Sequence, residues 1–138
     1  MRTFNQDIVL IFKIGFLAYL LDILTAKDLY KNCKYPVTNQ VELLFHHVLY
    51  IFSLTGWLSD NKTLLKIYVV STILYFTHWY FNNNNCRFTE MTKKDCNINI
   101  PLRTIQYING IIDHDRKGQI TIGVITLCIA IYKIYYIN

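Results

Sequence analysis

The chain has 138 residues, of which 53% are hydrophobic and 17% charged, and its formal net charge is +5. A soluble domain carries roughly a quarter charged residues, so the composition favours a protein in contact with lipid. Four apolar stretches occupy about half of the chain and leave no room for a separate soluble domain with its own core. The basic residues cluster in loops beside these stretches, which favours the anionic surface of a membrane over nucleic acid as their partner.

The four apolar stretches predict transmembrane helices. They cover about residues 8–24, 41–58, 64–81 and 120–137. Each is close to the roughly 17–25 residues that cross the hydrocarbon core of a bilayer. The predicted fold class is therefore all-α: a polytopic membrane protein with four transmembrane helices, in which residues 1–138 form a single membrane domain.

The first segment contains two charged residues, Lys13 and Asp22. Because Lys13 interrupts the apolar region and no small-residue cleavage site follows Asp22, we expect a retained helix and not a signal peptide. Small and polar side chains share one face of this helix, which should meet other helices. They are Gly15, Ala18, Tyr19 and Asp22.

The second and third segments should form an antiparallel helical hairpin, because the turn between them, residues 59–62, is short. The loop before the second segment, residues 25–40, is basic, and Pro36 should break any helix within it. Each segment carries one polar helical face. On the second segment this face comprises Glu42, His46, Tyr50 and Ser53, and on the third Ser71, Tyr75, His78 and Asn82.

The longest loop, residues 82–118, contains an amphipathic pattern after Pro101. Within residues 102–113, apolar side chains recur at helical spacing, at Leu102, Ile105, Ile108 and Ile112. This stretch is too short to span a bilayer, so it predicts an amphipathic surface helix that lies on the membrane. Gly118 should end the loop before the last transmembrane helix.

The distribution of basic residues predicts the orientation. Loops 25–40 and 82–118 hold nine of the fourteen Lys and Arg residues. Cytoplasmic loops of membrane proteins carry an excess of these residues, so both loops should be cytosolic and both termini should lie on the opposite side. The basic side chains would bind anionic lipid head groups there.

Several ionisable side chains should lie at a similar depth, within about two helical turns of one membrane face: Asp22, Glu42, His46, His47 and His78. Such groups tend to face the bundle interior and to pair, so this polar intramembrane cluster is either an element of helix packing or a site for a proton or metal ion. Packing is the better interpretation, because adjacent His46 and His47 diverge by about 100° and match no metal motif. We expect His46 and His78 to face each other, with Asp22 or Glu42 nearby.

The remaining motifs predict no catalytic chemistry. No Cys-x-x-Cys motif is present, and Cys86 and Cys96 would form a disulfide on an oxidising side but stay free thiols on a cytosolic one. Residues 113–124 copy the start of an EF-hand loop, but Lys117 and Val124 occupy positions unsuited to calcium. The sequence contains no catalytic triad pattern and no phosphate-binding loop, so we expect neither an enzyme nor a cofactor.

The third segment ends in His78-Trp79, followed by an asparagine run, then Cys86-x-Phe88-Thr89-Glu90 and finally Cys96. This arrangement, within about residues 78–113, resembles that of small uncharacterised multipass membrane proteins of giant viruses (nucleocytoplasmic large DNA viruses). A Cys-x-hydrophobic-Thr sequence after a helix is also similar to an uncharacterised bacterial membrane family. The viral resemblance implies a component of a viral or virus-modified membrane, and neither resemblance brings an established activity.

Taken together, these features predict a structural or scaffolding role, in a virion inner membrane or a host endomembrane. The partners would be the lipid bilayer and membrane proteins, either copies of this chain or viral or host proteins. One alternative is a small oligomeric channel or proton pathway that uses Asp22, Glu42, His46 and His78. A metal-dependent membrane enzyme at the same residues is the third interpretation.

Overall fold

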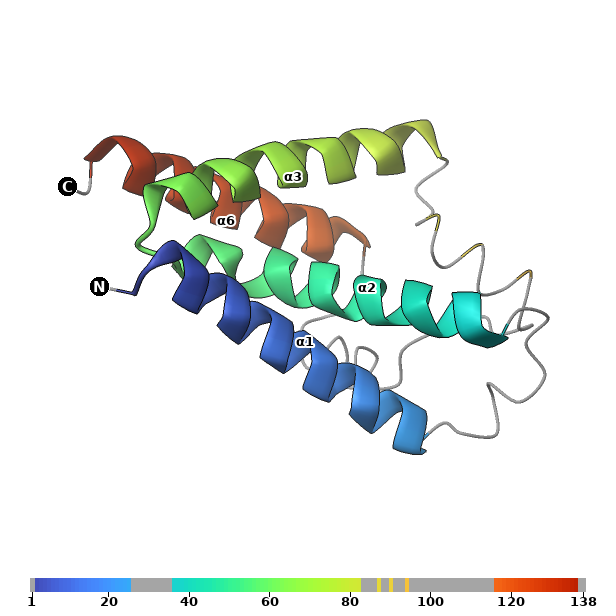
Figure 1. Cartoon of the computed structure of the whole chain (residues 1–138). Helices are drawn as coiled ribbons and strands as arrows, with labels where there is room; N and C mark the ends of the chain where they lie inside the picture. Colours follow the sequence, from blue (N-terminus) through green and yellow to red (C-terminus); the bar gives the residue numbers. More distant parts are fainter. Residues whose placement is uncertain are drawn as a thin grey trace.

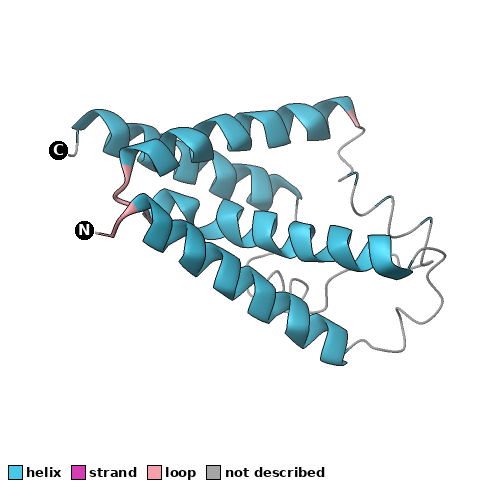
Figure 2. Cartoon of the chain, in the orientation of Figure 1, coloured by secondary structure: helices cyan, strands magenta, loops and turns pink. Residues whose placement is uncertain are grey.

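A computed structural model describes residues 2–25, 36–82 and 116–136, together with Arg87, Glu90 and Lys94. These ranges contain four long helices and one short 3₁₀ helix (Figures 1 and 2): α1 (Phe4–Thr25), α2 (Pro36–Thr55), η1 (Gly56–Leu58), α3 (Lys62–Phe81) and α6 (Arg116–Tyr136). No strand occurs within them, so the prediction of an all-α fold is confirmed for this part of the chain. The predicted surface helix at 102–113, Cys86 and Cys96 lie outside the described residues.

The helices alternate in direction, so both ends of the chain and the turn between α2 and α3 lie at one end of the bundle (Figure 1). α1 packs along α2, and α3 packs along α6. α2 and α3 meet near their connecting turn and diverge toward the other end (Figure 1). The short turn makes α2 and α3 antiparallel, as predicted, but the closely packed pairs are α1–α2 and α3–α6.

Helix boundaries correct two predictions. α2 begins at Pro36, which the sequence predicts to break a helix. Proline suits the first turn of a helix, because the N–H that it lacks would have no partner inside the helix there. α6 begins at Arg116, so Gly118 lies inside the helix and does not separate it from the loop. Because residues 116–124 are helical, the EF-hand-like spacing does not form a calcium loop.

Asn61 sets the start of α3. Its side-chain Oδ1 accepts hydrogen bonds from the backbone N–H groups of Thr63 at 3.0 Å and Leu64 at 3.1 Å. Both N–H groups belong to the first turn, where a helix supplies no partner of its own, so Asn61 acts as the N-cap. The helix therefore begins two residues before the apolar segment that the sequence indicates.

The buried core lies near the α2–α3 turn. Leu64, Leu65 and Tyr68, in the first two turns of α3, are at most 1% exposed and pack against α2 and α6. The Tyr68 hydroxyl lies 2.8 Å from Oγ1 of Thr126 on α6 and 3.2 Å from the carbonyl oxygen of Ser53 on α2. One side chain thereby connects three helices at this end of the bundle.

Two helical stretches are long and apolar enough to cross a membrane, Phe4–Thr25 and Gln40–Leu58. In the most apolar part of each stretch, only 17% of the first and 22% of the second is buried inside the protein. A core helix of a soluble protein, in contrast, is mostly buried. By length and composition, these helices indicate association with a membrane. Among the described residues, the apolar part of α6, Ile120–Tyr136, is shorter than these two stretches, and α3 is not one of the helices that are long and apolar enough to cross a membrane. The structure therefore has two candidate spans, whereas the sequence predicts four.

Candidate functional site

A buried aspartate–histidine pair connects α1 and α2. Oδ2 of Asp22, near the end of α1, lies 2.8 Å from Nε2 of His47, in the middle of α2. Both side chains are 0% exposed. Of the described residues, these are the two most deeply buried ionisable side chains that contact each other, so we take this pair as the candidate functional site.

Helical periodicity places the two side chains opposite each other. On α1 the buried face runs through Asp7, Ile11, Gly15 and Asp22, and on α2 it runs through Leu43, His47 and Ile51. These residues recur every four or seven positions, which is the spacing of one helical face. Gly15 permits the close approach, because a Cβ atom at this position would lie only 2.8 Å from Cα of Val48.

The second ring nitrogen of His47 defines the proton arrangement. Nδ1 lies 2.7 Å from the carbonyl oxygen of Leu43, one turn earlier on α2. A carbonyl oxygen only accepts hydrogen bonds, so Nδ1 carries a proton and donates it. The contact between Nε2 and Asp22 then also holds one proton, either on the ring, as imidazolium and carboxylate, or on the carboxyl, as neutral imidazole and acid. Both arrangements give the pair no net charge.

Aromatic and apolar side chains enclose the pair. The ring of Tyr19 meets that of His47 edge-on, with centroids 5.8 Å apart and an interplanar angle of 79°. The Tyr19 hydroxyl donates a hydrogen bond to Oε1 of Gln40 at 2.8 Å. Leu43 is buried one turn from His47 and packs against Ile23 of α1. In such surroundings a hydrogen bond is strong, and loss of one partner is costly.

The structure places the predicted cluster differently from the sequence analysis. Asp22 is buried, but its partner is His47, whereas Glu42 and His46 are half-buried on the neighbouring face of α2. His78 is exposed near the end of α3, at the end of the bundle where α3 has diverged from α2 (Figure 1). The signal that identifies His47 is its spacing of four residues from both Leu43 and Ile51, which makes it part of the apolar face.

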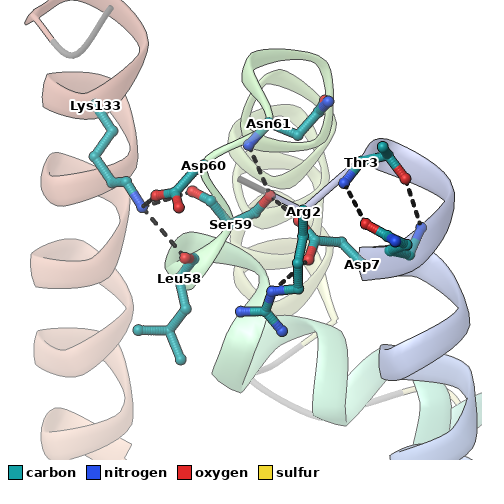
Figure 3. Close-up of polar contacts among 9 residues, drawn as sticks. Arg2, Thr3, Asp7, Leu58, Ser59, Asp60, Asn61 and Lys133 are labelled. Atoms are coloured by element: carbon teal, nitrogen blue, oxygen red, sulfur yellow. Dashed lines mark hydrogen bonds and ion pairs between the residues drawn. The ribbon is translucent and has the colours of Figure 1, made fainter.

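A second polar cluster lies where the α2–α3 turn meets α1 and α6 (Figure 3). We call it the turn cluster, and its side chains are those of Arg2, Asp7, Ser59, Asp60 and Lys133. The buried Asp7 carboxylate accepts a hydrogen bond from the Ser59 hydroxyl and lies 3.3 Å from Nε of Arg2. Asp7 is not among the predicted site residues, although its spacing of four and eight residues from Ile11 and Gly15 puts it on the same face.

Lys133 connects α6 to the same turn. Its Nζ lies 3.0 Å from Oδ1 of Asp60 and donates to the carbonyl oxygens of Ser59 at 2.6 Å and Leu58 at 3.3 Å. These carbonyls lie at and just after the end of η1, so the ammonium supplies a partner to backbone acceptors that the helix leaves unpaired. The hydrogen bond and the positive charge of Lys133 lower the pKa of Asp60 below its ordinary value.

Within residues 2–25, 36–82 and 116–136, no three His, Cys, Asp or Glu side chains are grouped closely enough to hold a metal ion. The contact between Asp22 and His47 can hold a proton and transfer it between Nε2 and Oδ2.

Comparison with protein-family models, curated proteins and solved structures finds no match to this chain. The resemblance to giant-virus membrane proteins therefore stays a prediction that rests on the sequence between residues 78 and 113.

Proposed function

We propose that this chain is a multipass integral membrane protein in which α1, α2, α3 and α6 each cross the bilayer, and that its role is structural. The observation that carries the proposal is the surface of α1, where large hydrophobic side chains are exposed around most of the helix. They are Ile8, Val9, Leu10, Phe12, Ile14, Phe16, Leu17, Leu20, Leu21 and Leu24. Such a surface is stable against lipid but costly in water, at roughly 25 cal/mol per Å².

The polar residues of α1 support the same environment. Asp7 and Asp22 are buried toward the bundle, and the carboxyl groups contact Ser59 and His47, respectively. Inward-facing, paired carboxyl groups are the arrangement that a bilayer tolerates. Lys13 is exposed on the outer surface of α1. A charge in this position is stable when it meets a carboxylate, so we expect a second copy of the chain or another membrane protein at this face.

The lengths and ends of α3 and α6 support two further spans. With 20 and 21 residues, each helix is about 30 Å long, which matches the hydrocarbon core of a bilayer. Exposed aromatic side chains lie at their ends: Tyr80 and Phe81 at the end of α3, and Tyr135 and Tyr136 at the end of α6. Because the two helices are antiparallel, these aromatic groups mark opposite faces of the proposed membrane, as interfacial belts do.

The arrangement of the helix ends agrees with the predicted topology. Both termini and the α2–α3 turn lie at one end of the bundle (Figure 1). In the proposal, the basic segments 25–40 and 82–118 lie in the cytosol, where they bind anionic lipid head groups or protein partners. The location, a virion inner membrane or a host endomembrane, is part of the proposal on the basis of the viral resemblance alone.

Reporter tags test the number of spans. Glycosylation acceptor tags at Met1, after Asp60 and at Asn138 should be modified, because all three positions lie on the side opposite the cytosol, whereas a tag in residues 26–35 should remain unmodified. The protein should also resist extraction by alkaline carbonate. Opposite results for the tags at Met1 and Asn138 would contradict an even number of spans, and release by carbonate would contradict integration.

The second candidate function is a proton pathway, which the buried Asp22–His47 pair favours because it holds a transferable proton. Proton flux across liposomes separates the two roles. A purely structural protein gives no flux above that of empty liposomes, whereas a pathway gives flux that Asp22→Asn abolishes.

A further inference from the structure

We propose that the side of α1 centred on Lys13 is the docking surface for a transmembrane helix of a different protein, one that carries an aspartate or glutamate near the bilayer centre. This inference deepens the proposed function and rests on it for one point, namely that α1 crosses a bilayer. The position of Lys13 on α1 and the exposure of its neighbours come from the folded chain alone.

Lys13 lies on the side of α1 that faces away from the bundle. It is two residues from each of Ile11 and Gly15, which are buried against the other helices. Two residues correspond to about 200° around a helix, so Lys13 is on the opposite side. α1 is also at the edge of the bundle, where α2 is the helix packed along it (Figure 1). The described part of the chain therefore leaves this side of α1 uncovered.

The neighbours of Lys13 on this side are large, apolar and exposed. At a spacing of one or two helical turns they are Val9, Leu10, Phe16, Leu17 and Leu20. We call these five residues and Lys13 the outer face. Its shape and chemistry suit the apolar side of another transmembrane helix, and its single cation selects a helix with a carboxylate.

Lys13 also lies near the middle of the proposed span. It is nine residues after Phe4, the first residue of α1, and twelve before Thr25, the last. These separations are about 14 Å and about 18 Å along the helix axis. The side chain extends only about 6 Å toward the surface, which leaves the ammonium group in the hydrocarbon core. A charge there is costly unless it meets a group of opposite charge.

The described residues provide no carboxylate for this role. Among them, none forms an ion pair with Lys13. Asp7 and Asp22 are buried on the opposite side of α1, where each has a partner. In the proposed topology, the segments that join the helices at the cytosolic end lie outside the hydrocarbon core. The carboxylate that meets Lys13 must therefore come from another molecule.

A second copy of this chain does not supply it. Copies with the same topology keep each residue at the same depth, so two outer faces would bring Lys13 against Lys13. Glu42 is the remaining carboxylate of the described helices α1, α2, α3 and α6. Gly15 lies beside Val48, and α1 and α2 run antiparallel (Figure 1). Glu42 is therefore about 12 Å from the level of Lys13 along the bundle axis, in the direction away from which the lysine side chain leans.

A designed peptide tests the inference with the full chain in phosphatidylcholine liposomes. The peptide is a leucine–alanine helix of about 20 residues with one aspartate at its centre. Its matched controls carry leucine at the centre, or the aspartate two helical turns nearer one end. Energy transfer between a donor at the C-terminus of the chain and an acceptor on the peptide measures association. We expect the central aspartate to strengthen association about tenfold over leucine, and the displaced aspartate to have little effect.

Variants of the chain assign this preference to Lys13. Lys13→Leu should lose it, and Lys13→Glu should prefer a peptide with a central lysine instead. Lys66→Met is the matched control, because it removes another exposed lysine, near the start of α3, and should keep the full preference. A preference that is absent from the unmodified chain, kept in Lys13→Leu or lost in Lys66→Met would overturn the inference. Energy transfer between two copies of the chain that Lys13→Leu abolishes would overturn it in favour of a second copy.

Carbonate extraction keeps the two proposals apart. A protein that resists extraction but shows no preference dependent on Lys13 overturns the docking surface and leaves the membrane role standing. A protein that carbonate extracts overturns both proposals.

Discussion

Replacement of Gly15 by alanine should force α1 and α2 apart. An ideal Cβ atom at this position would lie 2.8 Å from Cα, 2.9 Å from Cγ2 and 3.2 Å from the backbone nitrogen of Val48. Ordinary van der Waals contact begins near 3.4 Å. Because two of the three crowded atoms belong to the backbone of α2, side-chain rotation cannot relieve the contact, and the helices must separate by about half an ångström or more.

The expected cost follows from two opposing effects. Overpacking of a close interface costs about 1–3 kcal/mol. Alanine in place of glycine in a helix returns up to about 1 kcal/mol through helix propensity. We therefore expect Gly15→Ala to lower the free energy of unfolding by up to about 2 kcal/mol. Since Asp22 lies two turns further along α1, the same separation should weaken its hydrogen bond to His47.

Gly123→Ala is the matched control. Its Cβ would meet the ring of Phe76, whose contacting atoms are at the far end of a half-buried side chain that can rotate. Reversible unfolding in mixed micelles, followed by circular dichroism, should show a larger loss for Gly15→Ala than for Gly123→Ala. In a Val48→Ala background the loss should be only partly restored, because the contacts with Cα and the backbone nitrogen persist. A Gly15→Ala chain at least as stable as Gly123→Ala would refute the reasoning.

Two further predictions concern the end of the bundle that holds the turn. Tyr68→Phe should lower the free energy of unfolding by about 1 kcal/mol, because the hydroxyl loses its contacts with Thr126 and Ser53. Combination with Thr126→Val should cost less than the sum of the single changes, and strict additivity would contradict a direct interaction. Lys133 lowers the pKa of Asp60 below its ordinary value of 3.8. The ionised Asp60 side chain therefore stabilises the fold at pH values above 3.8, and this contribution is lost as the pH falls through the lowered pKa. Lys133→Met should raise the pKa of Asp60 in an NMR titration of the carboxyl carbons, and an unchanged midpoint would exclude the pairing.

The sequence predicted the positions of the helices better than their contacts. Long apolar runs made the four helices visible, and the small and polar face of α1 that contains Gly15 and Asp22 does meet α2. The error on α2 was one residue of register. Glu42, His46 and Tyr50 form one helical stripe, and Leu43, His47 and Ile51 form the adjacent one. The apolar residues Leu43 and Ile51 favour the stripe of His47, and the contact with Asp22 of the partner helix completes the choice.

The pairing of helices could not be predicted from loop lengths. A short turn makes α2 and α3 antiparallel neighbours, but it does not decide how much of their length is in contact. The close approach of α1 to α2 at Gly15 and the cross-helix contacts of Tyr68 determine the packing, and both depend on atomic shape. Pro36 illustrates the same limit, because proline both ends helices and begins them, and its role depends on the chain around it.

The turn cluster has a consequence for the order in which the chain assembles during synthesis. Asp22 and His47 are 25 residues apart, so α1 and α2 can pair as soon as both have left the ribosome. Ser59 reaches back 52 residues to Asp7 and completes a second contact once the turn emerges. Lys133 follows Ser59 by 74 residues and is therefore made well after the turn. Until α6 is released, the carbonyl groups of Leu58 and Ser59 lack the partner that Lys133 provides, so a chain stopped before α6 should present this turn as a recognisable signal of incomplete synthesis.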